Sequence, residues 1–321
     1  MSRVLALTGG VGGAKLGLGL AQRLSPDQLA FVVNTGDDFD HLGLRICPDL
    51  DTLMYTLSGE SNTEQGWGRR NESFACLDAL AALGGEAWFR LGDRDLAVHL
   101  QRTQALRNGA SLTAATKLLN DALGVRHSVL PMSDDPIATI VETTDGPLSF
   151  QHYFVRDRCG PAVTGFHFDG AAHARVNVAL EEWLDRNPID GIIICPSNPF
   201  VSVDPILQVP GMTDLLRRTT APIIAVSPIV AGLAIKGPAA KMMDELNVPR
   251  TAAAVAEHYG DLLDGFVLDD GDAALRVVIE ARGVVCHVTN TIMVTLADRI
   301  ALADHCLALI NRLQANESTP G

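Results

Sequence analysis

The sequence lacks a Cys-x-x-Cys pair, a long apolar run and a cluster of basic residues, and each absence excludes a class of protein. Its six cysteines are widely spaced, which excludes a zinc knuckle and a secreted disulfide framework. The apolar run from Val4 to Leu7 is too short for a signal-peptide core, and no later run approaches the length that spans a bilayer. We therefore expect free thiols, a cytoplasmic location and no membrane contact.

Positive charge is also scarce. The 25 lysines and arginines face 38 aspartates and glutamates, which gives a formal net charge of −13. Such a chain repels a polyphosphate backbone, and we expect no nucleic-acid partner. With 321 residues, 47% of them apolar and only 20% charged, the chain is expected to fold compactly as one large domain with an inserted lobe, or as two domains.

The hydrophobic pattern predicts an α/β fold. A strand over residues 4–8, a glycine turn over 9–13, a helix over 15–24 and a second strand over 29–34 together form a βαβ unit. Later runs predict that the parallel sheet resumes, at residues 191–195, 222–226, 265–268 and 284–288.

The middle of the chain has a different pattern. Residues 48–124 are mostly helical, and residues 128–167 contain short β-rich runs, including a hairpin of 137–142 with 148–154 around Asp145-Gly146. We therefore predict a nucleotide-binding core from residues 1–60 and 180–310, an inserted helical and β-hairpin lobe at 61–179, and a flexible tail at 311–321.

The glycine turn is the first segment with chemical potential. Glycines permit positive φ and lack Cβ atoms, so backbone N–H groups can converge on phosphate oxygens at the positive end of the following helix. The turn matches neither G-x-G-x-x-G nor the Walker pattern. It predicts a phosphate-binding site without identifying a nucleotide family, and a purely structural tight turn is the alternative.

An acidic cluster comes second. Asp37 and Asp38 follow the second strand, and Asp49 and Asp51 stand at the start of a helix. Ligands of open parallel sheets bind beyond the carboxyl ends of the strands, which places Asp37 and Asp38 beside the glycine turn. Carboxylates at such a place suit magnesium. The alternatives are that Asp49 and Asp51 merely cap a helix and that Asp37 is a ribose ligand.

Three further segments carry polar groups. The loop from Cys195 to Pro199 follows a buried strand and offers Ser197 and Asn198 as hydrogen-bonding groups. Lys236 and Lys241 lie near a later loop and would add positive charge for a diphosphate, although Lys241 fits a solvated helix position equally well. The charged run from Gly92 to Asp95 is equally consistent with a local ion pair.

In these segments the sequence resembles the 2-phospho-L-lactate transferase family of coenzyme F-420 biosynthesis. The matching segments keep the order of that family between residue 4 and about residue 300, and they are Thr8 to Lys15, Asn34 to Asp38, Ile46 to Thr52, Gly66 to Gly68, Leu91 to Asp95, Cys195 to Pro199 and Lys236 to Pro238. The stretch from Phe39 to Leu42 departs from a tryptophan-containing sequence that many relatives carry.

The resemblance implies a Rossmann-like three-layer core with a smaller inserted α+β lobe, a homodimer and magnesium as cofactor. The implied reaction transfers a phospho-hydroxy-acid unit from a guanosine diphosphate adduct to the ribityl hydroxyl of 7,8-didemethyl-8-hydroxy-5-deazariboflavin, with release of GMP. The acid is phospholactate, phosphoenolpyruvate or 3-phosphoglycerate. These acids differ by small groups that one pocket side chain could select, so the choice is open.

The resemblance and the residues together predict the site. The catalytic residues are Asp37, Asp38 and Asp51, with magnesium on Asp37 and Asp51, while Asp38 orients the attacking hydroxyl. The predicted nucleotide-binding set is Gly9, Gly10, Val11, Gly12, Gly13, Lys15, Ser197, Asn198, Pro199 and Lys236. The predicted deazaflavin-binding set is Asn34, Thr35, Trp67, Asp93 and Arg94.

Two other functions stay open at this point. An NAD(P)-dependent oxidoreductase shares a glycine turn and an acidic residue after the second strand, but its fingerprint is imperfect here. A nucleotide-binding regulatory protein of related fold would keep the glycine turn without a transferase activity. The segments at residues 46–52 and 92–95 favour the transferase.

Overall fold

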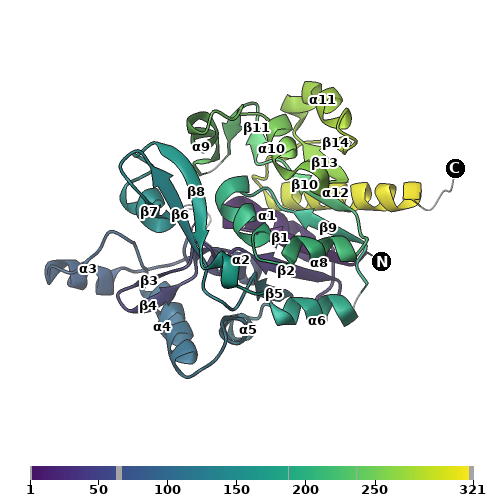
Figure 1. Ribbon diagram of the computed structural model, residues 1–321. Coiled ribbons are helices and arrows are strands. Elements are labelled where there is room, and N and C mark those ends of the chain that lie inside the picture. The colour runs from purple at the N-terminus through teal and green to yellow at the C-terminus, as the bar shows by residue number, and fades with distance from the viewer. Residues whose placement is uncertain (1, 63–66, 187, 236, 318–321) are drawn as a thin grey trace.

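The computed structural model describes residues 2–62, 67–186, 188–235 and 237–317. Its centre is a parallel seven-stranded sheet in the order β14-β13-β10-β9-β1-β2-β5 (Figure 1). These strands are β1 (Val4–Thr8), β2 (Leu29–Val33), β5 (Ser128–Pro131), β9 (Gly191–Ile194), β10 (Ile223–Val226), β13 (Gly265–Leu268) and β14 (Val285–Val288). The chain order reverses between β1 and β9, as in doubly wound nucleotide-binding folds. The predicted α/β fold with a parallel sheet is confirmed.

The strands are continuous apolar runs because both faces of the sheet are covered. Every residue of β1 and β2 is buried, and successive side chains point to opposite faces. Leu5 and Leu7 therefore pack in one hydrophobic core, whereas Val4 and Ala6 pack in the other. The sheet thus separates two cores, and helices close each of them.

Helices cover both faces of the sheet (Figure 1). The core that contains Val4 is closed by α1 (Gly10–Ala21), α2 (Pro48–Ser58), α5 (Leu112–Ala122) and α12 (Leu296–Glu317). The other core is closed by α6 (Val178–Arg186), α8 (Met212–Arg218), α9 (Ala239–Glu245), α10 (Ala252–Tyr259) and α11 (Arg276–Glu280). The result is a three-layer arrangement.

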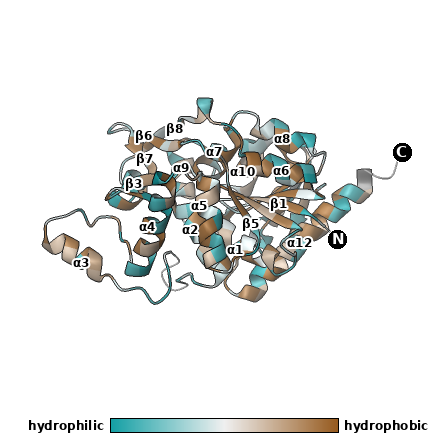
Figure 2. Cartoon of the chain, turned by 90° about the horizontal axis from the view of Figure 1, so that it is seen from below, coloured by the Kyte–Doolittle hydropathy of each residue, from teal (hydrophilic) through white to brown (hydrophobic). Residues whose placement is uncertain are grey.

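Beyond the core, the chain forms a lobe and an arm. An antiparallel sheet contains the predicted hairpin, and its strands are β6 (Ala138–Thr143), β7 (Leu148–Ser149) and β8 (Val163–Asp169). The hairpin is confirmed, but β7 stops at Ser149 and a π-helical turn, η1 (His152–Arg156), follows. The arm carries α3 (Ala75–Ala82), which stands apart from the rest of the molecule, and leads into α4 (Asp93–Arg107) (Figures 1 and 2).

Some boundaries differ from the prediction. β5 lies within residues 61–179, which we assigned to the inserted lobe, but it pairs with β2 at the edge of the central sheet. The four-residue strand ends at Pro131, and proline is confined to such edge positions. Residues 311–317, predicted as flexible tail, continue α12 and bury Leu313.

Two hairpins were not predicted at all. One is β3 (Phe39–His41) with β4 (Leu44–Ile46), and the other is β11 (Ile229–Val230) with β12 (Leu233–Ala234). A short helix, α7 (Asp204–Leu207), completes the elements that matter for the site. No helix within the described ranges has both the length and the hydropathy needed to cross a membrane.

A buried ion pair joins α4 to α2. Arg102 on α4 is only 1% exposed, and its two terminal nitrogens donate to the two carboxylate oxygens of Asp51 on α2. Nη1 also donates to the backbone oxygen of Arg45 over 3.4 Å and lies 3.2 Å from Nδ1 of His99. Removing one partner of such a pair leaves a buried charge without compensation.

We therefore expect Arg102→Met to lower the free energy of unfolding by about 3–5 kcal/mol, because Asp51 would keep its charge in a buried site. Arg23→Met is the control, since Arg23 forms an exposed pair with Asp304. It should cost no more than about 1 kcal/mol. Urea unfolding followed by circular dichroism measures both, and equal losses would contradict the assignment of a buried, paired charge.

Candidate active site

A cavity of about 680 Å³ opens at the carboxyl end of the parallel strands. Residues that follow β1, β2, β9, β10 and β14 line it, and the lobe closes one side. Strands β1 and β9 are the neighbours at which the strand order reverses. The cavity therefore lies at the position where doubly wound sheets bind ligands.

The glycine segment is the start of α1 rather than a separate turn. The helix begins at Gly10, so Gly10 to Gly13 form its first turn, which corrects the prediction of a loop over residues 9–13. Gly10 has φ of 63°, a backbone conformation that favours glycine. At Gly12 a Cβ atom would lie 2.3 Å from the carbonyl oxygen of Pro196. The first turn of α1 thus touches the loop after β9.

The first amides of α1 are partly committed to protein groups. The N–H of Gly9 donates to Oγ of Ser197 over 3.2 Å, and that hydroxyl donates back to the carbonyl of Gly9 over 2.7 Å. The N–H of Gly10 donates to Asp49 over 2.7 Å. Since the opening turn of a helix cannot pair its own N–H groups, the amides of Val11 and Gly12 at the cavity are left to attract an anion.

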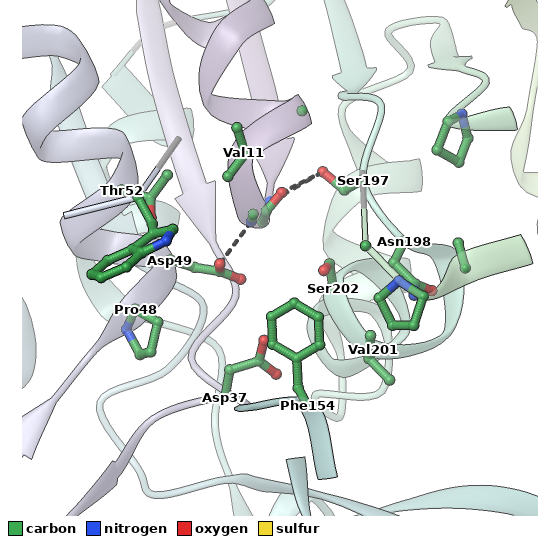
Figure 3. Close-up of a pocket in the computed structure, with 18 of the residues that line it drawn as sticks. Val11, Asp37, Pro48, Asp49, Thr52, Phe154, Ser197, Asn198, Val201 and Ser202 are labelled. Atoms are coloured by element: carbon green, nitrogen blue, oxygen red, sulfur yellow. Dashed lines mark hydrogen bonds between the residues drawn. The ribbon is translucent and has the colours of Figure 1, made fainter. Parts of the chain in front are cut away.

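Two buried carboxylates, Asp37 and Asp49, share the cavity wall. In Figure 3 both side chains project into the same space below the first turn of α1. Oδ1 of Asp49 accepts the Gly10 bond, and Oδ2 accepts from Nδ2 of Asn34 over 3.0 Å. Oδ1 of Asp37 is buried and has no hydrogen-bond partner among the described residues. Asp37 therefore has unused coordinating capacity.

Burial raises the pKa of both carboxyls. Burial raises the pKa of Asp49 to about 6, although the hydrogen bonds from Asn34 and Gly10 limit the rise. Burial, followed by repulsion from Asp49, holds the pKa of Asp37 well above its usual range. Two carboxyls with raised pKa values that face one cavity are a common feature of functional sites.

Asp51, a predicted metal ligand, is not part of the cavity lining. It lies in a buried cluster whose ligand atoms, from Asp51, Asp95 and His99, are within 4.8 Å of one another. The guanidinium of Arg102 already supplies the counter-charge to Asp51, and the hydroxyl of Tyr55 donates to Asp95 over 2.5 Å. The cluster is therefore held together by its own ion pair and hydrogen bond, and it lies outside the cavity. Of the acids at the start of α2, Asp49 is the one that faces the cavity.

Asp38 is not in the lining either. Its carboxylate is fully enclosed, and Oδ2 lies 3.7 Å from Nη2 of Arg45. Burial raises the pKa of Asp38 to about 7 against the opposing effect of Arg45. This position behind Asp37 does not support the predicted role of Asp38 in orienting an attacking hydroxyl.

The structure brings most of the predicted nucleotide-binding set together. The members that line the cavity are Gly9, Gly10, Val11, Gly12, Lys15, Ser197 and Asn198. Lys15 donates from Nζ to the carbonyl of Met293 over 2.9 Å. Gly13 packs against Thr8 and Ser197, and Pro199 is buried at the start of a second π-helical turn, η3 (Pro199–Val203). Lys236 lies outside the described residues.

The predicted deazaflavin-binding set is dispersed. Trp67 lines the cavity, whereas Asn34 serves to hold Asp49. Thr35 faces a second, smaller cavity of about 240 Å³. Asp93 accepts bonds from the start of α3, and Arg94 is exposed with its backbone N–H bonded to Glu72. Of this set, only Trp67 therefore lies on the cavity wall.

Apart from Trp67, an aromatic wall of the cavity was missed by sequence reasoning. It consists of Trp67 and Trp88 with Phe89, Phe150 and Phe154. The Phe150 and Phe154 rings stack with centroids 5.4 Å apart. Behind the wall, Phe39 contacts Phe89 edge-on at 4.9 Å, which shows what the Phe39 to Leu42 stretch contributes. Two adjacent aromatics at 88–89, in a chain with 5% aromatic residues, were the available signal.

Comparison with known proteins places this architecture in a family. A family model described as 2-phospho-L-lactate transferase CofD matches residues 4–296. The chain belongs to this family. The resemblance inferred from the motifs is thereby confirmed, as is its assignment to a family of transferases.

Relatives that carry two different names align with this chain over almost their whole length. A phosphoenolpyruvate transferase of Streptomyces griseus is 40% identical over 98% of this chain and 100% of its own length. A phosphoenolpyruvate transferase of Streptomyces avermitilis is 42% identical over 97% of this chain and 99% of its own length. A 2-phospho-L-lactate transferase of Methanosarcina mazei is 37% identical over 94% of this chain and 98% of its own length.

The fold also matches a solved structure. A member of the upf0052 family from Bacillus halodurans superposes with a TM-score of 0.62, covering 96% of this chain and 99% of its own, at 15% sequence identity. At this identity the comparison establishes a shared fold.

The close contact at Gly12 gives a prediction. Gly12→Ala should separate the α1 turn from the Pro196 loop and lower the unfolding free energy by about 1–3 kcal/mol, because the new methyl group meets a backbone oxygen. Gly165→Ala is the matched control, since its Cβ would meet only Cβ of Glu142 at 3.9 Å. Chemical denaturation compares the two, and equal stability of both variants would refute the contact.

Proposed function

We propose that this protein transfers a phospho-hydroxy-acid unit from a guanosine diphosphate adduct to the ribityl hydroxyl of 7,8-didemethyl-8-hydroxy-5-deazariboflavin and releases GMP, as a step of coenzyme F-420 biosynthesis. The observation that carries the proposal is a single cavity in which helix-start amides, a buried carboxylate pair and an aromatic wall face one another. The names of the aligned relatives support the same class of reaction. The homodimer and the cytoplasmic location stay predictions.

The donor end of the cavity suits a diphosphate. The amides of Val11 and Gly12 and the positive end of the α1 dipole favour phosphate oxygens. Ser197 and Asn198 lie across from them on the loop after β9. We assign the guanosine diphosphate moiety to this end.

The carboxylate pair fits magnesium. Asp37 has a buried oxygen without a partner, and Asp49 is held in a fixed orientation by Gly10 and Asn34. Magnesium commonly takes one or two carboxylates together with phosphate oxygens and water. Asp37 and Asp49, in place of Asp37 and Asp51, would hold it, and when bound it supplies charge neutralisation for the diphosphate.

The aromatic wall suits a planar acceptor. Stacking on Trp67, Trp88 or Phe154 would fix a deazaflavin ring and direct its ribityl chain toward the carboxylate pair. In the reaction, the terminal hydroxyl gives up its proton to water and its oxygen forms a bond to the distal phosphorus, while the bond from that phosphorus to the bridging oxygen breaks. The leaving GMP is already charged. Alignment and charge compensation are therefore the main tasks of the side chains.

The reaction is tested by mass spectrometry of the protein incubated with the deazaflavin, magnesium and each of the three guanosine diphosphate adducts. We expect a phospho-acid ester of the deazaflavin and stoichiometric GMP with at least one adduct, which also identifies the acid.

Asp49→Asn should lose about 100-fold or more in rate, because a carboxylate that would hold the charge-neutralising magnesium is gone. Asp27→Asn, at an exposed site, should retain full rate. Binding of guanine nucleotide without any product would instead favour a regulatory protein.

A second prediction concerns pH and magnesium. Because the folded pKa of Asp49 is raised from 3.8 to about 6, the folded state binds protons more tightly between these values, so the metal-free protein loses stability as pH rises through this window. Magnesium needs the ionised carboxyls. We therefore expect added magnesium to raise the melting temperature at about pH 8 but not at about pH 5. Differential scanning fluorimetry measures this, and Asp49→Asn should abolish the gain; an equal gain at both pH values would argue against the site.

A further inference from the structure

Two walls of the cavity come from distant parts of the chain. Residues 150–155, from the end of β7 into η1, form part of one wall, and residues 237–239, which lead into α9, form part of another. A polar cluster behind the lining joins them. We call it the Lys241 cluster, and it consists of Lys241, Glu245, Tyr153 and the carbonyl group of Pro161.

The bonds of this cluster run from α9 to the lobe. Nζ of Lys241 donates to Glu245 over 2.5 Å, to the carbonyl of Pro161 over 3.1 Å and to the hydroxyl of Tyr153 over 3.3 Å. The second oxygen of Glu245 accepts from the N–H of Val163, the first residue of β8, over 3.0 Å. Lys241 thus connects α9 to η1 and to the loop after η1, and Glu245 connects α9 to the start of β8.

The cluster acts on the aromatic wall through Tyr153. This residue is completely buried and stands on η1 between Phe150 and Phe154, whose stacked rings line the cavity. On the other side, α9 is fixed by the buried Met242 and Met243. The lobe side is a single π-helical turn, and the bonds from Lys241 add to the packing of its buried Tyr153.

An ordinary helix-surface pair offers a comparison within the same chain. Lys117 and Asp121 on α5 are also four residues apart and lie 2.6 Å from each other, but both side chains are mostly solvent-exposed. Such pairs contribute little. Lys241 differs because two of its three acceptors belong to the lobe, not to its own helix.

We propose that Lys241 is a positioning residue that holds η1 against α9 and thereby sets the place of the Phe150 and Phe154 rings. The inference rests on the proposed function for the identity of the ligand at this wall, the deazaflavin acceptor. Loss of the Nζ bonds frees η1 and weakens acceptor binding. The donor end is affected less, because no hydrogen bond joins the amides of α1 or Asp49 to the cluster in the described part of the chain. Asn198 at that end does meet α9, but at Met242 over 3.4 Å and not through Lys241.

Steady-state kinetics of three variants test this. Lys241→Met keeps the apolar stem but removes the donor, and we expect the KM for the deazaflavin to rise about tenfold while the KM for the adduct changes less than about twofold. Lys241→Arg, which keeps a charged donor, should restore most of the acceptor affinity. Lys117→Met should match the wild type. Equal rises in both KM values, or a fall in kcat alone, would overturn the inference.

Hydrogen–deuterium exchange without substrates tests the cluster separately from the reaction. Amides of residues 148–163 should exchange faster in Lys241→Met than in Lys117→Met, and unchanged exchange there would also overturn the inference. Tyr153→Phe keeps the buried ring and removes only the hydroxyl, so it should give a smaller change in the same direction if Lys241→Met does not fold. If residues 148–163 exchange more slowly in the wild type than in Lys241→Met, but the wild type turns over none of the adducts, the proposed function is refuted and the role of the cluster is not.

Discussion

Hydrogen bonds to the first two residues at the start of α1 hold the site together. Asp49 binds the N–H of Gly10, and Ser197 binds both backbone groups of Gly9. They join α1 to the start of α2 and to the loop after β9. Where the strand order of a parallel sheet reverses, the connections leave toward opposite faces and a crevice opens between them. These bonds give that crevice a fixed width, and Gly12 allows the two sides to touch.

Several buried aspartates lie in and around the same region of this acidic chain. Burying a carboxylate is costly unless another group compensates it, and the structure compensates these acids unequally. Asp51 has the guanidinium of Arg102, Asp38 has Arg45 at a longer distance, and Asp49 has two N–H donors. Asp37 faces the cavity, and its Oδ1 has no hydrogen-bond partner among the described residues. This unpartnered oxygen on the cavity wall supports the proposed magnesium site.

The fold and the site carry different kinds of information. A protein of 15% identity shares the fold. A fold by itself does not specify an activity. The specific groups are added around the sheet. The arm supplies Trp67, Trp88 and Phe89, the lobe supplies Phe150 and Phe154, and the Lys241 cluster ties the lobe to the core. The proposed acceptor site is thus built by the arm and the lobe, whereas the proposed donor site lies at the carboxyl ends of the central strands β1 and β9.

The sequence by itself determined six strands of the sheet, the hairpin of the lobe and the segments that form the donor end, because buried parallel strands are continuous apolar runs and glycine has a local conformational meaning. It also determined the family. Only the tertiary structure decided which acids face the cavity. Asp49 and Asp51 are two residues apart on one helix, so their side chains are about 200° apart around the helix axis. Composition cannot decide which of the two faces the cavity. The aromatic wall combines three segments distant along the chain, and β5 is a short edge strand, so contacts made only on folding decided both.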